Sequence, residues 1–310
     1  MKKLIYILGI ITLPFVGIAQ QEAMFTHYMF NTLSINPAYA GSRDALTITG
    51  IHRSQWVGIE GAPITQTVTA HTPIHRDELG VGLSIINDRI GPTNTTSLYG
   101  DIAYRLKVTE NAKLAFGLKA GLNLMQSGLS NLKLTDNDGT DQSFVNNIQS
   151  KALPNFGFGM YYSTPKFYVG LSSPRILQNN FISNNSSNAG LKSEKRHYFL
   201  IGGAVFQVTN NIKFKPTTFL RVTSAAPLEA DLTASLLFHE TLMIGLMGRS
   251  GDAVGLLVGI NATPQLGIGY SFDWSFGVRT GKYNGGSHEL MIRYDFIFRD
   301  KEKIQSPRYF

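Results

Sequence analysis

Apolar and polar residues alternate along most of this chain with the two-residue period of a β-strand. In residues 228–238, LEADLTASLLF, apolar side chains occupy every second position from Leu228 to Phe238. Residues 113–124, 266–274 and 290–298 repeat the pattern. Such segments predict strands with one apolar face, and many of the positions opposite that face hold glycine or another small residue, which suits the wall of a crowded barrel.

The pattern predicts 14 strands, an even number. Their expected ranges are 45–53, 64–72, 79–88, 95–108, 112–125, 153–163, 166–172, 197–208, 213–222, 228–238, 241–249, 253–262, 265–274 and 288–298.

The lengths of the connections distinguish a membrane barrel from a soluble sandwich, which would also alternate. Even-numbered connections are brief, whereas the odd-numbered ones include 55–63, 87–94, 126–152, 173–196 and 275–287. Outer-membrane barrels have short periplasmic turns and longer extracellular loops, and a Greek-key sandwich has no reason to alternate in this way. The expected fold is therefore an all-β transmembrane antiparallel β-barrel of about 14 strands, preceded by a short N-terminal periplasmic segment.

The first residues predict export. Lys2 and Lys3 precede an apolar stretch, and Gly17 and Ala19 supply the small residues of a cleavage site. A membrane anchor is the alternative, but the apolar run is short and Pro14 interrupts it. We expect a cleaved signal peptide (1–19), a periplasmic segment or plug (20–44), an outer-membrane barrel (45–298) and a periplasmic tail (299–310).

Composition narrows the function further. The net charge is +7 and no basic patch stands out, so no nucleic-acid partner is expected. No cysteine is present, so an exported chain must rely on its core or its topology rather than on disulfides. We find no zinc-protease, nucleophile-elbow, Walker or dinucleotide motif, and expect no enzyme, no cofactor and no metal centre.

Two weaker signals remain. His71 and His75 flank Pro73 at a strand end, where helical ligand spacing does not apply, and both are expected to be solvated. Residues 135–142, TDNDGTDQ, resemble a calcium loop without its distal Glu, so a polar loop tip is favoured and calcium stays open.

Charged residues of both signs fall on the face opposite the apolar one and are expected to line the lumen. We interpret them as a salt-bridged or wetted lining in preference to an ion pathway. A 14-stranded barrel is too wide for side chains alone to fill. The segment 20–44, the 126–152 loop or a partner is expected to occupy it. The predicted lumen charges are Asp101, Arg105, Lys107, Lys113, Lys119, Lys213, Lys215, Arg221, Glu229, Asp231, Asp273, Glu289, Arg293 and Asp295.

The sequence RSQWVGIEGAPIT, residues 53–65, reads as the first extracellular loop. Trp56 is expected at the rim as the most exposed candidate anchor for a partner, with Gly58, Gly61 and Pro63 making the turn.

Three sequence blocks give this chain a family resemblance. They are YMFN with NPAYAG (28–31 and 36–41), the loop at 53–65, and the closing strand with His288, Glu289, Tyr294 and Phe296. In these blocks the chain resembles the PorP/SprF family of outer-membrane proteins of the type IX secretion and gliding machinery, and its tail SPRYF, residues 306–310, resembles the SprF side of that family. Tyr28, Phe30, Asn31, Asn36, Pro37 and Tyr39 are its candidate residues in the periplasmic segment.

The resemblance implies a binding protein in the outer membrane. An SprF-like member helps to export or anchor a large SprB-like gliding adhesin by binding its C-terminal domain. A PorP-like member, the nearest alternative, links the secretion apparatus to periplasmic motor or ring lipoproteins or to a peptidoglycan-binding protein. A small-solute channel is the third reading. Deleting residues 20–42 is expected to disturb function more than barrel insertion.

Overall fold

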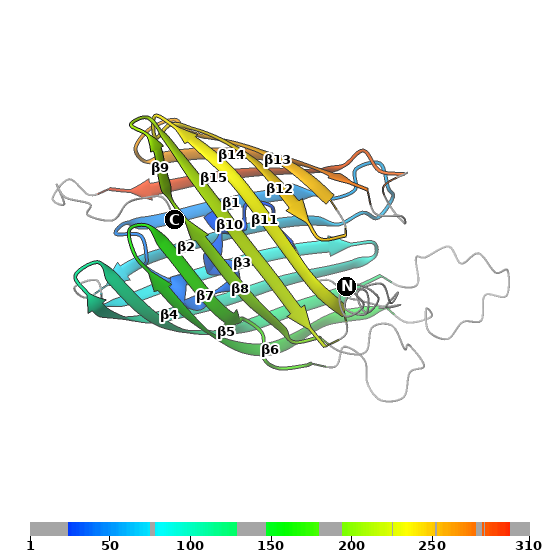
Figure 1. The fold of residues 1–310 in the computed structure, drawn as a ribbon. Helices are drawn as coiled ribbons and strands as arrows, with labels where there is room; N and C mark the ends of the chain where they lie inside the picture. Colours follow the sequence, from blue (N-terminus) through cyan, green and yellow to red (C-terminus); the bar gives the residue numbers. More distant parts are fainter. Residues whose placement is uncertain are drawn as a thin grey trace, which may run out of the picture.

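Fourteen antiparallel strands close into a barrel in a computed structural model that describes residues 24–74, 78–128, 147–179, 194–224, 226–251, 253–276, 281 and 283–297 (Figure 1). The strands are β1 (Leu46–Ser54), β2 (Ile64–Ile74), β3 (Leu79–Ile90), β4 (Thr93–Thr109), β5 (Ala112–Ser127), β6 (Ile148–Ser163), β7 (Phe167–Ser173), β8 (His197–Ala204), β9 (Phe206–Thr209), β10 (Ile212–Thr223), β11 (Ala226–Phe238), β12 (Leu242–Arg249), β13 (Ala253–Asn261), β14 (Leu266–Ser275) and β15 (Ser287–Phe296). Only Val205 separates β8 from β9, and both pair with β10, so they form one strand of the wall. The predicted fold class is confirmed.

The barrel closes between its first and last strands. β1 pairs with β15 from Leu46↔Phe296 to Ser54↔His288, and every other strand pairs with its neighbours in the chain. Closure gives the backbone donors and acceptors of every strand a partner, which an open sheet in lipid would lack. We call the end at Ser54 and His288 the loop end, and the end at Leu46 and Phe296 the turn end.

The wall separates apolar from polar positions as the sequence pattern predicts. In β12, Leu242, Ile244 and Leu246 point outward and are exposed, while Met243 and Met247 point inward and are buried. Outward positions of the other strands carry the same apolar surface, with Leu118 and Leu232 more than 60% exposed. An apolar exterior of this kind is typical of a lipid-facing wall. None of the helices in the described ranges is long and apolar enough to cross a membrane.

Two connections at the loop end differ from the sequence-based expectation. The expected long connection at 87–94 is a two-residue turn, because β3 continues to Ile90 and β4 begins at Thr93. The pairing of β3 with β4 continues to Ile90↔Thr93, and the Asn87 side-chain amide also donates across it to Asn94 Oδ1 at 2.9 Å. The loop expected at 126–152 is also shorter, since β5 ends at Ser127 and β6 begins at Ile148.

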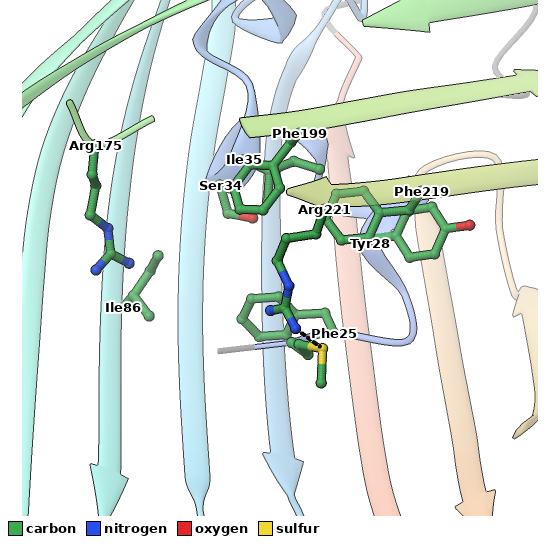
Figure 2. A pocket seen from close by; sticks show the side chains of 10 residues that line it. Phe25, Tyr28, Ser34, Ile35, Ile86, Arg175, Phe199, Phe219 and Arg221 are labelled. Atoms are coloured by element: carbon green, nitrogen blue, oxygen red, sulfur yellow. Dashed lines mark hydrogen bonds between the residues drawn. The ribbon is translucent and has the colours of Figure 1, made fainter. Parts of the chain in front are cut away.

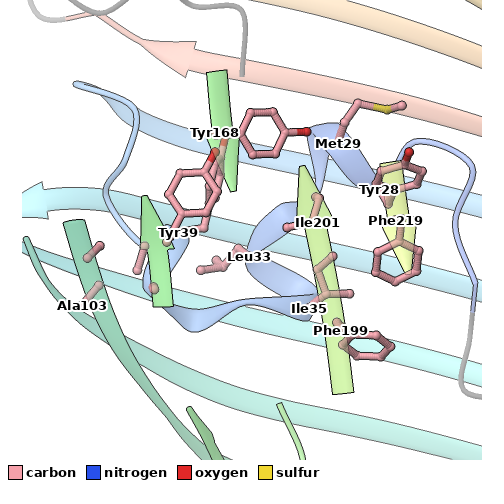
Figure 3. Packing of buried hydrophobic residues seen from close by; sticks show 14 of the residues in the cluster. Tyr28, Met29, Leu33, Ile35, Tyr39, Ala103, Tyr168, Phe199, Ile201 and Phe219 are labelled. Carbon is pink, nitrogen blue, oxygen red and sulfur yellow. The ribbon is translucent and has the colours of Figure 1, made fainter. Parts of the chain in front are cut away.

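The lumen holds the segment before β1, residues 24–44, which we call the plug (blue in Figure 1). It consists of three short turns of helix: η1 (Tyr28–Phe30), α2 (Thr32–Ile35) and η2 (Pro37–Tyr39). The core of the molecule lies between plug and wall, where Figure 3 shows side chains such as Leu33 and Tyr39 of the plug among Tyr168, Ile201 and Phe219 of the wall. A barrel of this width thus gains its core from the chain's own N-terminal segment.

Candidate functional site

Glycines on the inner face of the wall make room for the plug backbone. A Cβ atom added to Gly80 of β3 would lie 2.0 Å from the carbonyl oxygen of Ala40, and one added to Gly117 of β5 would lie 2.2 Å from the amide nitrogen of Ala38. Real Cβ contacts are essentially never this short. Glycine at these two positions therefore permits a backbone-to-backbone contact that any other residue would prevent.

Asn36 fixes the middle of the plug to β6. Its side-chain amide donates to the carbonyl oxygen of Met160 at 3.0 Å, and its Oδ1 accepts from the backbone N–H of Ala38 at 3.0 Å. The opposing wall position is Gly159, whose added Cβ would lie 2.1 Å from Asn36 Oδ1. The same side chain therefore caps η2 and joins it to the wall.

Further contacts hold the other plug residues predicted from the sequence. The Tyr28 hydroxyl lies 3.1 Å from Thr217 Oγ1, and Asn31 Oδ1 accepts from Thr69 Oγ1 at 2.9 Å. Burial raises the pKa of the Tyr28 phenol, so this group stays protonated over the physiological pH range. Phe30 is half-buried, and Pro37 and Tyr39 are buried. All six residues lie inside the barrel.

An ionic cluster anchors the plug near the loop end. Glu289 of β15 accepts from the backbone N–H groups of Thr26 (2.9 Å) and His27 (2.7 Å), and lies 2.7 Å from His27 Nδ1. Arg53 of β1 pairs with Glu289 at 3.1 Å and with Asp273 at 2.7 Å, and donates to Thr26 Oγ1 at 2.9 Å. Buried charges are stable only when paired and hydrogen-bonded, so each group here depends on the others.

The cluster continues along the inner wall. Arg249 lies 3.9 Å from Asp273 and forms a bidentate pair with Asp231, with donor–acceptor distances of 2.9 Å. Arg221 pairs with Glu229 and lies 2.8 Å from the sulfur of Met24. Figure 2 shows Arg221 reaching beside Phe25 into a narrow cavity between the plug and the wall.

A second anchor lies at the turn end. Arg43, at the end of the plug, donates to both oxygens of Asp295, at 2.9 and 3.3 Å, while Thr47 Oγ1 donates to Asp295 Oδ1 at 2.7 Å. His71 accepts from the backbone N–H of Gly41 at 3.1 Å and is 4% exposed. The expectation of a solvated His71 is therefore wrong, because its place on the inner face of β2 turns it toward the plug. His75 lies outside the described residues.

The remaining predicted lumen charges differ in burial. Lys119 pairs with Asp101 at 2.8 Å and donates to the carbonyl oxygen of Leu33 at 3.4 Å. Arg105 is buried and donates to the carbonyl oxygen of Leu79 at 3.3 Å, and Lys213 pairs with Glu240. Lys107 is exposed and Lys113 half-buried near the turn end, whereas Lys215 and Arg293 are buried beside Phe30.

The first loop forms an ordered part of the rim. Val57 exchanges backbone hydrogen bonds with the loop before β15, through Gly286 O at 2.9 Å and Gly285 N at 2.7 Å, and Gly61 O accepts from Gly91 N at 2.8 Å. Gly58 and Gly61 adopt positive φ angles of 97° and 73°, as a turn between Trp56 and Pro63 requires.

Trp56 is not the most exposed aromatic residue of this rim. It is half-buried with a φ of 50°, and its backbone N–H donates to Ser287 Oγ at 3.2 Å. Tyr283, on the neighbouring loop, is 75% exposed, and Val57 beside Trp56 is 42% exposed. Tyr283 and Val57 are therefore among the described side chains that a partner could contact at this point.

Sequence reasoning did not identify four of the anchoring residues: Thr26, His27, Arg43 and Arg249. The two-residue period of β12 places Arg249 on the inner face with Met243 and Met247, so its parity could have identified it. The other three lie in irregular backbone, where no periodicity indicates direction. Arg53 is not among the predicted lumen charges and was singled out only as part of the 53–65 block that carries the family resemblance.

Some predictions fall outside the described residues. They are the signal peptide at 1–19, the calcium-like loop at 135–142 and the tail at 299–310. Across the described ranges, no group of three or more His, Asp or Glu side chains is arranged to hold a metal ion.

Comparison with known proteins establishes the family. Solved structures with a similar fold include the outer membrane protein Omp33 of Acinetobacter baumannii (TM-score 0.45, 11% identity, 83% of this chain and 100% of that chain). The CymD monoaromatic hydrocarbon channel is also similar, with a TM-score of 0.49 and 8% identity over 86% of this chain and 93% of that chain. The KdgM porin has a TM-score of 0.38 and 10% identity over 81% of this chain and 99% of that chain. No curated protein matches this chain. Residues 17–294 match the family described as type IX secretion system membrane protein PorP/SprF, so the chain belongs to that family and its barrel lies in the outer membrane.

Proposed function

We propose that this protein is a plugged docking barrel that holds a secreted surface protein at the outer membrane, by binding its C-terminal region at the loop end. The observation that carries the proposal is the plug, which occupies the lumen and is anchored by an ion pair at the turn end and by hydrogen bonds to Glu289 at the loop end. A lumen packed in this way does not suit diffusion of solutes, which argues for a binding role rather than a channel or a catalytic one.

The loop end suits a protein partner. Long loops of outer-membrane barrels face the outside, and the two longest connections join strand ends at this end, β5 to β6 and β7 to β8. The ordered part of the rim joins the β1–β2 loop to the β14–β15 loop and presents Tyr283 and Val57. Exposed tyrosine is favourable at protein interfaces, since its large side chain has few rotatable bonds and loses little conformational entropy on binding.

Within the family, the adhesin-holding role of SprF-like members is our first proposal. A PorP-like role predicts a different partner surface, since periplasmic components meet the turn end. Contacts with other parts of the type IX machinery follow from the family in either case.

The test is a mild-detergent purification of the tagged protein from its native membranes, followed by mass spectrometry. We expect a large secreted protein, or its C-terminal region, in near-equal amount, and a loss of at least about tenfold in recovery for the Tyr283→Ser, Val57→Ser double variant. Val208→Ser, an exposed position at the turn end, is the matched control and should leave recovery unchanged.

Other outcomes would lead to different conclusions. Recovery of periplasmic lipoproteins or a peptidoglycan-binding protein alone, lost with turn-end variants and not with rim variants, would establish the PorP-like role instead. A barrel recovered without any partner, combined with ion conductance of the intact protein in planar bilayers, would contradict the docking proposal and support the channel.

A further inference from the structure

A second cavity, of about 600 Å³, opens at the turn end between Phe30 of the plug and the inner wall of β10 to β15. The turns 239–241 and 261–265 border it, and Leu237, Met243 and Met291 supply apolar side chains. Its volume falls within the range of roughly 300–1,000 Å³ that is typical of small-molecule sites.

The cavity arises from a local asymmetry of the plug. η2 packs against β4, β5 and β6, on the opposite side of the lumen. On the cavity side, the inward positions are Gly259 of β13 and Gly267 of β14, and the side chains of Met243 and Arg293 lie over them, 3.3 and 3.2 Å from where a Cβ atom would be. These two side chains, rather than the plug, therefore border the cavity at this wall.

Two cations lie over one aromatic ring in this cavity. Lys215 Nζ is 5.6 Å from the centroid of the Phe30 ring, and Arg293 Cζ is 5.5 Å from it. Both side chains line the cavity, and both are less than 10% exposed. The ring therefore has two positive charges within 6 Å of its centroid, on side chains that are largely shielded from water.

The carboxylates that line the cavity are each paired with a cation. Asp295 pairs with Arg43 at 2.9 Å and lies 3.7 Å from Arg293, and Glu240 pairs with Lys213. Counting these partners, the described groups at the cavity are four cations (Arg43, Lys213, Lys215 and Arg293) and two carboxylates. The site therefore has a positive potential, which favours an anion.

We propose that this cavity binds a compact organic monoanion, a carboxylate carried on an apolar or aromatic body. The carboxylate would lie beside Lys215 and Arg293, and the apolar body against Phe30, Met243 and Met291. Methionine side chains adapt their shape to a ligand at little cost, which suits recognition of a class rather than one molecule. The same chemistry is offered by a free carboxylate of the periplasm and by the C-terminal residue of a periplasmic polypeptide.

The test uses methionine methyl NMR on the full-length mature protein in nanodiscs. Phenylbutyrate is the probe, and phenylbutanol is its uncharged match. We expect phenylbutyrate to shift the Met243 and Met291 signals saturably and to leave Met125, buried at the loop end of β5, unchanged. Phenylbutanol and the Lys215→Gln variant should each weaken binding about tenfold or more, since a charge-assisted contact is lost. Lys113→Gln, near the turn end on another wall, should have no effect.

A second pair of probes identifies the source of the carboxylate. A dipeptide ending in phenylalanine with a free carboxylate is compared with its amide. Tighter binding of the free acid than of phenylbutyrate assigns the site to a polypeptide terminus, and weaker binding assigns it to free carboxylates. Equal shifts by phenylbutyrate and phenylbutanol, or no saturable shift up to about 10 mM in the folded wild-type protein, would overturn the proposal without reliance on any variant.

Discussion

A single methyl group on the inner wall should weaken the docking of the plug. The Gly117→Ala substitution places a Cβ atom 2.2 Å from Ala38 N, 2.4 Å from Pro37 C and 2.5 Å from Ala38 Cα. Because all three are backbone atoms, no side-chain rotation can relieve the overlap. Ordinary contact begins near 3.4 Å, so η2 must retreat by more than 1 Å from the wall.

The displacement has a definite energetic cost. Overpacking a close-packed interior costs about 1–3 kcal/mol, and an overlap with backbone belongs at the upper end, about 2–3 kcal/mol. The barrel ladder itself is intact, because alanine fits the φ and ψ angles of a strand. The cost therefore falls on plug docking, and the open state should become roughly 30 to 150 times more populated.

The absence of cysteine from the chain provides a clean reporter. Thr32→Cys places a thiol at a plug position that is 1% exposed, and maleimide labelling then measures plug opening. In the Gly117→Ala background we expect labelling to be roughly 30 to 150 times faster, because the open state is more populated by that factor. Gly100→Ala, on the outward face of the neighbouring strand with an atom no closer than 4.0 Å, is the matched control. Equal labelling rates in the two backgrounds, with both barrels folded, would refute the reasoning.

Three further perturbations test the other parts of the molecule. Arg53→Met leaves Asp273 and Glu289 short of a buried partner and should destabilise the docked plug by about 3–5 kcal/mol, measured by the same labelling, with Arg53→Lys intermediate. Leu232→Arg puts a charge on an outward position that is 63% exposed and should cost about 2–4 kcal/mol of barrel stability in lipid, whereas Leu232→Val should not. Deleting residues 24–42 should leave barrel insertion intact but produce steady conductance in planar bilayers; a closed deletion variant would show that the plug is not what blocks conduction.

The barrel could be predicted from the sequence because its signals are local. Alternation in segments such as 228–238 reflects two different solvents on the two faces of a strand, and connection length separates the two ends. The turn at Gly91 and Pro92 was missed because polar residues such as Asn87 and Asn94 resemble a loop, although cross-strand hydrogen bonds hold them in a ladder.

The path of the plug could not be predicted, because it depends on contacts between residues far apart in the chain. Nothing near Thr26 or His27 indicates that Glu289, more than 260 positions away, will bind them. The inner glycines were visible as small residues on the polar face, but which of them touch the plug follows only from the register of β3, β5 and β6. Similarly, the sequence predicts Trp56 as an exposed anchor, because it does not show that the Trp56 backbone N–H donates to Ser287 Oγ at the start of β15.

The plug also joins the two strands that close the barrel. Glu289 and Asp295 both lie on β15, six residues or about 20 Å apart. Each carboxylate binds the plug and a β1 side chain at once, Glu289 through His27 and Arg53 and Asp295 through Arg43 and Thr47. The pairing of β1 with β15 has the largest sequence separation in the wall, so its loop closure is the most costly in entropy. In the folded protein these contacts add to the ladder that joins β1 and β15. The plug therefore stabilises the closed barrel as well as obstructing its lumen.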